Sequence, residues 1–426
     1  MSFQETYKLL VDELSQIATL ESIDAVLGWD QETYLPSEAI EHRGDQSALI
    51  SGIVHSRSTS SKINDLLCKL EENIIEASFV EKRNIEKTRK EYNDSIKFTQ
   101  EFVEESAKLL TLAQDAWAKA REEKNYNQFK PWLKKILELK YKEIEILGSK
   151  AEKYDTLLDQ YESGFTTKEC KEMFNTLKPP LVELIQKVKD SNKNPVSTNG
   201  FYDLKKQEIF VRNVVEKIGF NFSQGRIDST THPFCTSLGP KDTRLTTRYD
   251  ENNFESNFYS VIHEMGHGLY DQGLPKSQYG LPSGSDCSLG IHESQSRFWE
   301  NLIGRSQGFW DYLYPEFENT FKTGISKDNL IFSINKIEPS FIRTEADQMT
   351  YNLHILIRFE IELGLINGEI SLDDLPEVWN QKYKEYLGIV PSNDAEVRTP
   401  GGSPPPTPAR DTCRQRARKT PRGCGS

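Results

Sequence analysis

The residues best suited to chemistry lie in the stretch SVIHEMGHGLYDQGL, residues 260–274. His263 and His267 are four positions apart, so on a helix both imidazoles project from one face and can bind one cation. Glu264 follows the first histidine in the H-E-x-x-H arrangement. In that arrangement the glutamate does not ligate the metal but takes a proton from water that the cation activates. The alternative is two ordinary histidines beside an acid, but the pattern favours a metal centre.

A third ligand is expected elsewhere, because a catalytic zinc usually has three protein ligands and keeps its fourth position for water. The stretch GIHESQSRFWENLIG, residues 290–304, offers His292 and Glu293 at the start of a second predicted helix. Spacing alone does not choose between them, and the glutamate could instead complement the helix dipole. His42 and His55 lie far away in the sequence among polar residues, and we expect them to be plain surface residues.

The segments that must position these residues are mostly helical. Apolar residues recur at helical spacing over residues 7–27, 102–120 and 131–147, which predicts a mainly α fold. Helix boundaries are predicted where proline and glycine interrupt the pattern, at residues 34–36, at Pro179 and Pro180, and before Gly200.

One strand is predicted directly before the H-E-x-x-H helix, at DTRLTTRY, residues 242–249, because its side chains alternate. The polar residues at 250–253 are expected to cap the helix that follows. An edge strand here could pair with an extended peptide over the metal, which favours a peptide substrate.

Two glycines, Gly266 and Gly268, flank the second histidine inside the predicted helix. Each costs about 1 kcal/mol relative to alanine. The cost predicts close approach of another element, and a merely tolerated glycine is the alternative.

A further helix is predicted from about Pro339 to Leu365. One stripe of its polar side chains follows helical steps and includes neither Lys nor Glu, unlike the solvated faces of this chain, so we expect the stripe to face a polar cavity. The stripe consists of Arg343, Asp347, Thr350, His354 and Arg358.

Composition limits the partners and the compartment. The net charge is −12, and the last thirty residues carry seven Lys or Arg and one acid, which leaves the body near −18. Such a body disfavours nucleic acid and anionic membranes as partners. The chain has no apolar run long enough for a membrane span, no apolar segment typical of a secretory signal, and six scattered cysteines. We expect a cytoplasmic protein with reduced thiols.

Several motifs, taken together, resemble one known family. They are GWDQETYLP at 28–36, HPF at 232–234, DTRLT at 242–246, HEMGH at 263–267 with HESQ at 292–295, and IRTEAD at 342–347. This combination resembles the carboxypeptidase Taq family of metallocarboxypeptidases, and the similarity covers roughly residues 1–396.

The resemblance implies a large helical clamshell around a deep groove, with a small β element beside the H-E-x-x-H helix. It also implies a homodimer that removes single residues from peptide C-termini with one Zn²⁺, or sometimes Co²⁺, per chain. In this sequence it makes His263 and His267 metal ligands, Glu264 the general base, and Glu293, not His292, the third ligand. It places HPF, DTRLT and IRTEAD on the groove wall.

An enzyme acting on peptides with a free C-terminus must recognise a carboxylate, which a guanidinium binds bidentately. Arg343 is our first choice for this role and Arg244 the second, although either could be a structural ion-pair partner. His232 is expected to donate to the developing oxyanion or to orient substrate, with a purely structural loop role as the alternative. A metal endo-oligopeptidase is the alternative activity.

The sequence departs from the family after Glu396, where the family pattern continues with G-x-x-Q-D-x-H-W. Residues 397–426 are instead rich in Pro, Gly and Arg. We therefore predict a metallopeptidase domain at 1–396, incomplete at its C-terminal end, and a disordered basic tail at 397–426. An out-of-frame reading or a foreign join is our hypothesis for the tail, and a genuine basic appendage is the alternative. The expected consequence is a chain that keeps its metal site but has weak or no peptidase activity.

Overall fold

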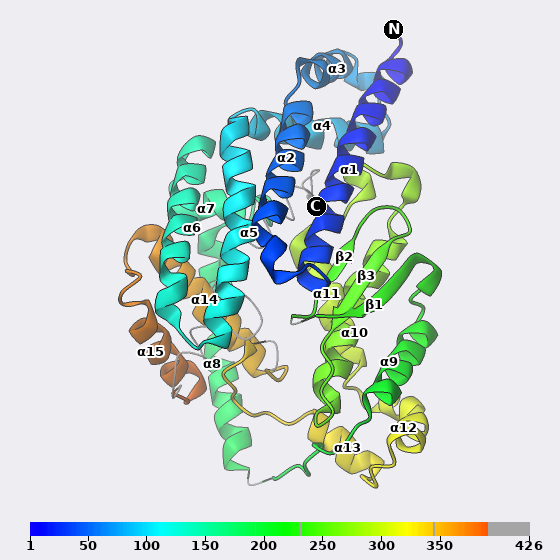
Figure 1. The fold of residues 1–426 in the computed structure, drawn as a ribbon, viewed down its shortest axis with the longest axis vertical. Coiled ribbons are helices and arrows are strands. Elements are labelled where there is room, and N and C mark those ends of the chain that lie inside the picture. Colours follow the sequence, from blue (N-terminus) through cyan, green and yellow to red (C-terminus); the bar gives the residue numbers. More distant parts are fainter. Residues whose placement is uncertain (192, 231, 344–345, 391–426) are drawn as a thin grey trace.

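The computed structural model describes residues 1–390 except 192, 231 and 344–345, so the predicted tail at 397–426 lies outside the described residues. The described chain is mainly helical, as predicted (Figure 1). Its helices are α1 (Phe3–Thr33), α2 (Ile40–Ser58), α3 (Ser61–Glu72), α4 (Phe79–Ser95), α5 (Gln100–Glu122), α6 (Tyr126–Leu147), α7 (Lys153–Leu158), α8 (Thr167–Asp190), α9 (Leu204–Ile218), α10 (Phe254–Gly273), α11 (Leu289–Arg297), α12 (Gln307–Phe321), α13 (Lys327–Ile334), α14 (Thr350–Asn367) and α15 (Leu375–Leu387).

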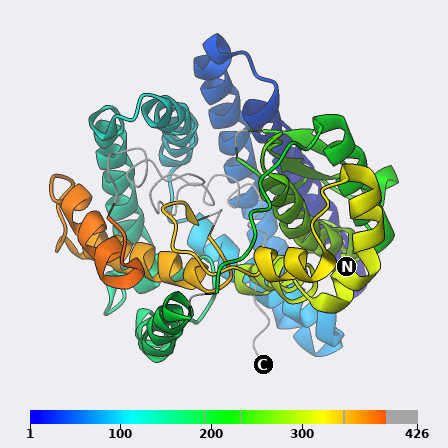
Figure 2. The same cartoon turned by 90° about the horizontal axis from the view of Figure 1, so that it is seen from below.

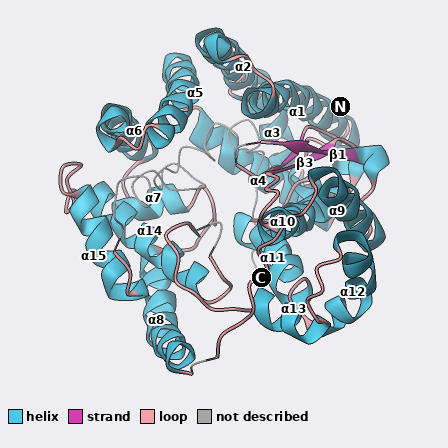
Figure 3. Cartoon of the chain, turned by 60° about the horizontal axis from the view of Figure 1, so that its bottom comes forward, coloured by secondary structure: helices cyan, strands magenta, loops and turns pink. Residues whose placement is uncertain are grey.

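The helices pack around separate apolar cores on two sides of the molecule (Figure 3). One core joins α5 to α8 with α14 and α15, through residues such as Leu133, Ile357 and Trp379. On the other side, α9, α10, α12 and α13 pack around an aromatic cluster centred on Phe254, and α1 to α4 form a neighbouring core. This arrangement agrees with the predicted helical clamshell.

A three-stranded sheet lies beside α10 and near the end of α1 (Figures 1 and 2). Its strands are β1 (Gly225–Ser229), β2 (Cys235–Ser237) and β3 (Thr243–Thr247), in the order β1-β3-β2. The predicted strand is β3, but the expectation that it forms an edge is wrong, because β1 pairs with it in parallel and β2 in antiparallel orientation. The edge strand next to the cavity is β2, whose short sequence carries no alternation long enough to predict.

Helix α10 begins as the sequence predicts, because the Asn253 side chain accepts a hydrogen bond from the backbone N–H of Ser256 at 3.2 Å. One face of α10 is buried in the aromatic core. The glycines on this helix permit close contacts: a Cβ on Gly266 would lie 2.6 Å from Ser296 Cα, and one on Gly268 would lie 2.8 Å from a ring carbon of Phe220. The predicted close approach is therefore confirmed at both positions.

Two predicted helix boundaries are wrong. Helix α8 continues through Pro179 and Pro180, which both lie on its exposed face, where carbonyls that lose their partners can reach solvent. The helix predicted from about Pro339 begins only at Thr350, because the Asp347 carboxylate accepts hydrogen bonds from the backbone N–H groups of residues 349 and 350 at 2.8 and 3.0 Å. Arg343 therefore precedes the helix.

The described helices and cysteines bear on membrane insertion and on thiol state. None of the described helices combines the length and apolar character that a bilayer-spanning helix needs. Over residues 1–390, with the gaps given above, the cysteines are free thiols: Cys68, Cys170, Cys235 and Cys287.

Candidate metal centre

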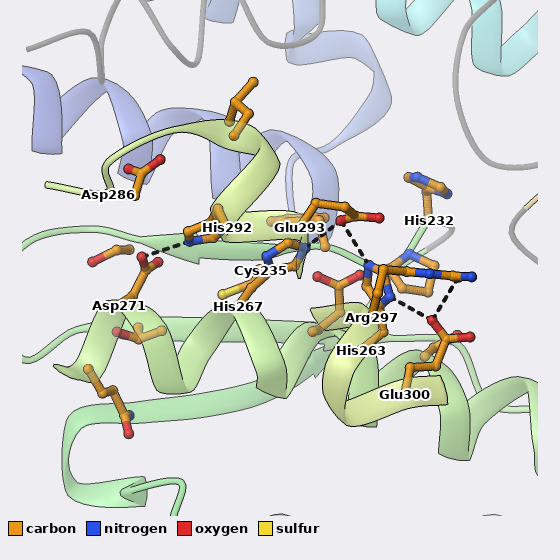
Figure 4. Close-up of a pocket in the computed structure, with 18 of the residues that line it drawn as sticks. His232, Cys235, His263, His267, Asp271, Asp286, His292, Glu293, Arg297 and Glu300 are labelled. Atoms are coloured by element: carbon orange, nitrogen blue, oxygen red, sulfur yellow. Dashed lines mark hydrogen bonds and ion pairs between the residues drawn. The ribbon is translucent and has the colours of Figure 1, made fainter. Parts of the chain in front are cut away.

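Two imidazoles and one carboxylate converge where α10 and α11 meet (Figure 4). The Nε2 atoms of His263 and His267 lie 3.6 and 3.3 Å from Oε2 of Glu293. One ligand atom from each residue lies within 4.8 Å of the other two, and this is the cluster with metal-ligating geometry in the described part of the chain. Two nitrogen donors and one carboxylate oxygen suit Zn²⁺ and leave one tetrahedral position open.

Glu300 orients the His263 imidazole through Nδ1, the ring nitrogen that does not face Glu293. Its Oε2 lies 2.8 Å from Nδ1 of His263, and Arg297 donates to the same oxygen at 3.2 Å. A histidine that binds a metal through Nε2 carries its proton on Nδ1, so this contact selects the ligating tautomer. Glu300 lies in a π-helical segment, Phe298–Ile303, that continues α11.

His292 points to a different partner. Its Nε2 lies 3.0 Å from Asp271 Oδ1, and its ring stacks on His267 with centroids 4.5 Å apart. The structure thus places the Glu293 carboxylate, and not a ring nitrogen of His292, in one cluster with the two histidines of α10 (Figure 4). His42 is exposed, and His55 Nε2 lies 2.9 Å from the Phe98 carbonyl oxygen, away from this cluster.

The cluster opens into a cavity of about 910 Å³. Its walls come from α1, β2, α10, α11 and the segment that leads into α14. Glu264 lies on this wall and is 7% exposed. Burial raises the pKa of the Glu264 carboxyl, against the opposing effect of the two nearby imidazoles.

The protonation states of His263 and Glu293 depend strongly on each other. Burial disfavours the charged imidazole of His263, but Glu293 and Glu300 outweigh this effect and raise its pKa to about 9. The pKa of Glu293 moves the other way: burial opposes the charged carboxylate, but the imidazoles lower the pKa far below its usual range. Without a metal, a proton on the His263 imidazole therefore offsets part of the carboxylate charge at neutral pH.

Arg343 reaches the cluster through a tyrosine. Its Nη1 donates to Tyr351 Oη at 2.6 Å, and this hydroxyl donates to Glu293 Oε1 at 3.4 Å. Arg297 stacks over the same tyrosine ring at 3.9 Å. Both arginines line the cavity, which places two guanidinium groups close to the predicted ligands.

The other two predicted substrate residues lie in different settings. His232 lines the cavity (Figure 4). Arg244 is absent from the cavity wall, and its Nε and Nη2 donate to the two carboxylate oxygens of Asp242, each at 2.9 Å. The structure places Arg244 in the ion pair that the sequence allowed as its alternative.

Sequence reasoning did not single out Glu300, Arg297 or Tyr351. Glu300 could have been found, because it follows Glu293 by seven residues and so lies on the same helical face two turns later. Arg297 and Tyr351 carry no such signal, since their contact joins two helices far apart in the sequence.

A buried acid beside two imidazoles and a carboxylate, in a deep cavity of a helical fold, defines a metallopeptidase of the H-E-x-x-H class. The chain belongs to the carboxypeptidase Taq (M32) family of metallopeptidases, whose family model matches residues 9–397.

Named relatives agree with this membership. The chain is 37% identical over 408 residues to thermostable carboxypeptidase 1 of Thermus thermophilus, covering 92% of this chain and 80% of the relative. It is 36% identical over 396 residues to carboxypeptidase 1 of Bacillus subtilis, covering 91% and 79%. The solved structure of an M32 carboxypeptidase from Deinococcus radiodurans superimposes with a TM-score of 0.85 at 30% identity, covering 96% of this chain and 84% of that one.

Proposed function

We propose that this chain is a metallocarboxypeptidase that hydrolyses the last peptide bond of peptides with a free C-terminus. The observation that carries the proposal is the convergence of His263, His267 and Glu293 beside the buried Glu264. The family supports a metal, and the nitrogen and oxygen donors favour Zn²⁺, with Co²⁺ as a substitute. A divalent ion bound there would act as a Lewis acid and make water more acidic.

Glu264 is the proposed general base. Its carboxylate takes a proton from the water that attacks the last peptide carbonyl and then gives it to the leaving amine nitrogen. Burial raises the pKa of Glu264 towards the operating pH, which suits a group that both accepts and returns a proton. Glu300 keeps His263 in the ligating tautomer throughout.

Arg343 is the proposed partner of the substrate C-terminal carboxylate, because it lines the cavity beside Glu293 through Tyr351. His232, on the cavity wall, is proposed to orient the substrate or to donate to the oxyanion. Arg244 is a weaker candidate, since its donors already bind Asp242. The homodimer, the cytoplasmic location and the division at residue 396 stay predictions.

The test is release of C-terminal amino acids from N-blocked dipeptides by purified protein, with and without a chelator. Chelator-sensitive release is expected, and its absence would support the reading of a catalytically impaired chain that keeps the metal site. An amidated peptide run beside its free acid separates exopeptidase from endo-oligopeptidase, because only the exopeptidase requires the free carboxylate.

Glu264→Gln tests the base. The variant should lose turnover while its metal content stays near that of the original chain, because the amide keeps the shape but cannot take the proton. Parallel loss of metal and activity would contradict the role of Glu264 as base and indicate a structural one.

A further inference from the structure

Arg358 is a buried cation whose hydrogen bonding is incomplete within the described residues. It lies on α14 and is 7% exposed. Its Nε and Nη1 atoms are buried and have no hydrogen-bond partner among the residues that the structure describes. Burying a charge without a counter-charge is costly, and proteins normally avoid it by pairing.

Two other buried ionic side chains in the described chain follow that rule. Lys140 donates to Glu143 at 2.8 Å, with both side chains almost fully buried. Arg43, whose side chain is 8% exposed, pairs with Asp30 at 2.6 Å. Arg358 differs from these pairs, since two of its buried nitrogens lack a partner among the described residues, and this favours a bound ligand.

The surroundings of Arg358 supply cations and neutral groups. Its guanidinium lies 5.0 Å from the ring centre of Trp379, and the electrostatic neighbours include Arg343, Tyr351 and Tyr383. Two acids follow Arg358 on α14: Glu360 pairs with Lys382 and accepts from the Tyr386 hydroxyl, and Glu362, one turn away, accepts a hydrogen bond from the Tyr154 hydroxyl at 3.1 Å.

A further donor nearby is also unsatisfied. Trp379 Nε1 is buried and has no hydrogen-bond partner within the described residues. Burial lowers the pKa of Arg358 to about 10, and Arg343 adds to this effect, so the guanidinium still carries its charge at pH 7. A positive, desolvated pocket wall with free N–H donors is suited to a small anion.

Arg358 lines the same cavity as Glu293 and Tyr351. It follows Tyr351 by seven residues on α14, which corresponds to about 10 Å along the helix axis. The site is therefore separate from the three predicted metal ligands but lies on the same wall.

We propose that Arg358 forms a binding site for a monovalent anion, filled either by chloride or by a carboxylate of a peptide in the groove. Both anions carry one negative charge and accept hydrogen bonds, and the carboxylate can also match the fork of the guanidinium. This proposal goes beyond the peptidase function. Anion binding can be measured on protein that does not turn over substrate, so the two proposals can fail independently.

The experiment is ³⁵Cl NMR line broadening by the full chain, in metal-loaded and chelator-treated forms, because a metal can also bind chloride. We expect excess broadening that persists after chelation and is lost in Arg358→Met. The matched control is Arg212→Met, which removes an exposed arginine that lies over the Phe222 ring at 3.7 Å and should leave the broadening unchanged.

Competition distinguishes the two sources of the anion. If a peptide carboxylate is the natural occupant, an N-blocked dipeptide with a free C-terminus will displace chloride from the chelated protein and its C-terminal amide will not. If neither dipeptide displaces it, chloride is the occupant. Absence of chelator-resistant broadening from the original chain, or its persistence in Arg358→Met, would overturn the proposal. If the methionine variant does not fold, Arg358→Lys should weaken the broadening, and an unchanged signal would overturn the proposal in the same way.

Discussion

Replacing Gly266 with alanine should damage the metal centre without touching any ligand. The new Cβ would lie 2.6 Å from Ser296 Cα and 2.7 Å from the Gln295 carbonyl oxygen, whereas ordinary contact begins at 3.4 Å. Both clashing atoms belong to backbone, so α11 must move by about 0.8 Å, the difference between 3.4 and 2.6 Å. Glu293 lies three residues before Ser296 on that helix and must move with it.

The displacement exceeds what a metal site tolerates, because ligand distances in such sites vary by only about 0.2 Å. We expect metal affinity to fall by about 10- to 100-fold, as when a supporting contact of a metal ligand is lost. Stability should change less, since overpacking costs about 1–3 kcal/mol while alanine in place of glycine restores about 1 kcal/mol of helix propensity.

The assay is titration of the metal-free protein with Zn²⁺ against a competing chelator, beside denaturant unfolding of the same samples. Gly273→Ala is the matched control, because it lies on the same helix and a Cβ there would meet nothing within 4 Å. If Gly266→Ala bound metal as tightly as the control, the conclusion that α11 approaches α10 closely enough to position Glu293 would be refuted.

Four further outcomes follow from the site and its supports. Glu300→Gln should lower metal affinity about 10- to 100-fold by weakening the selection of the His263 tautomer, and an unchanged affinity in the chelator competition would contradict this role. Because the neighbouring carboxylates raise the pKa of His263 to about 9 in the metal-free protein, a metal must displace a proton, so apparent affinity should rise from pH 7 to 9. A metal affinity independent of pH would count against the raised pKa of His263. The same raised pKa stabilises the metal-free fold, fully below about pH 6.5, the pKa of a histidine in the unfolded chain. Denaturant unfolding should show this contribution lost as pH rises through 9. Phe254→Ala should cost about 3–5 kcal/mol of unfolding free energy, because this ring is 2% exposed at the base of α10, whereas Phe201→Ala, at a residue 73% exposed, should cost little.

Local pattern was enough to predict much of this molecule. Helical periodicity predicts most of the long helices, and the four-residue spacing of His263 and His267 places both rings on one face, since both features depend only on the geometry of one helix. The cap at Asn253 is equally local. The start of α14 was missed because an Asp347 side chain, and not hydrophobic periodicity, decides where that helix begins.

Contacts between distant segments decided the rest. Strands β1 and β2 are too short to carry a pattern, and they exist because each pairs with β3. Spacing does not distinguish His292 from Glu293 as the third ligand. In the structure Asp271 contacts His292, whereas the close approach of α11 to Gly266 brings Glu293 to the imidazoles. The sequence by itself determined that α10 carries the candidate metal-binding histidines and the candidate base. Only the packing of α11 against α10 decided the third candidate ligand. The physical reason is that this ligand depends on how the surfaces of two helices fit, and not on the order of residues within one helix.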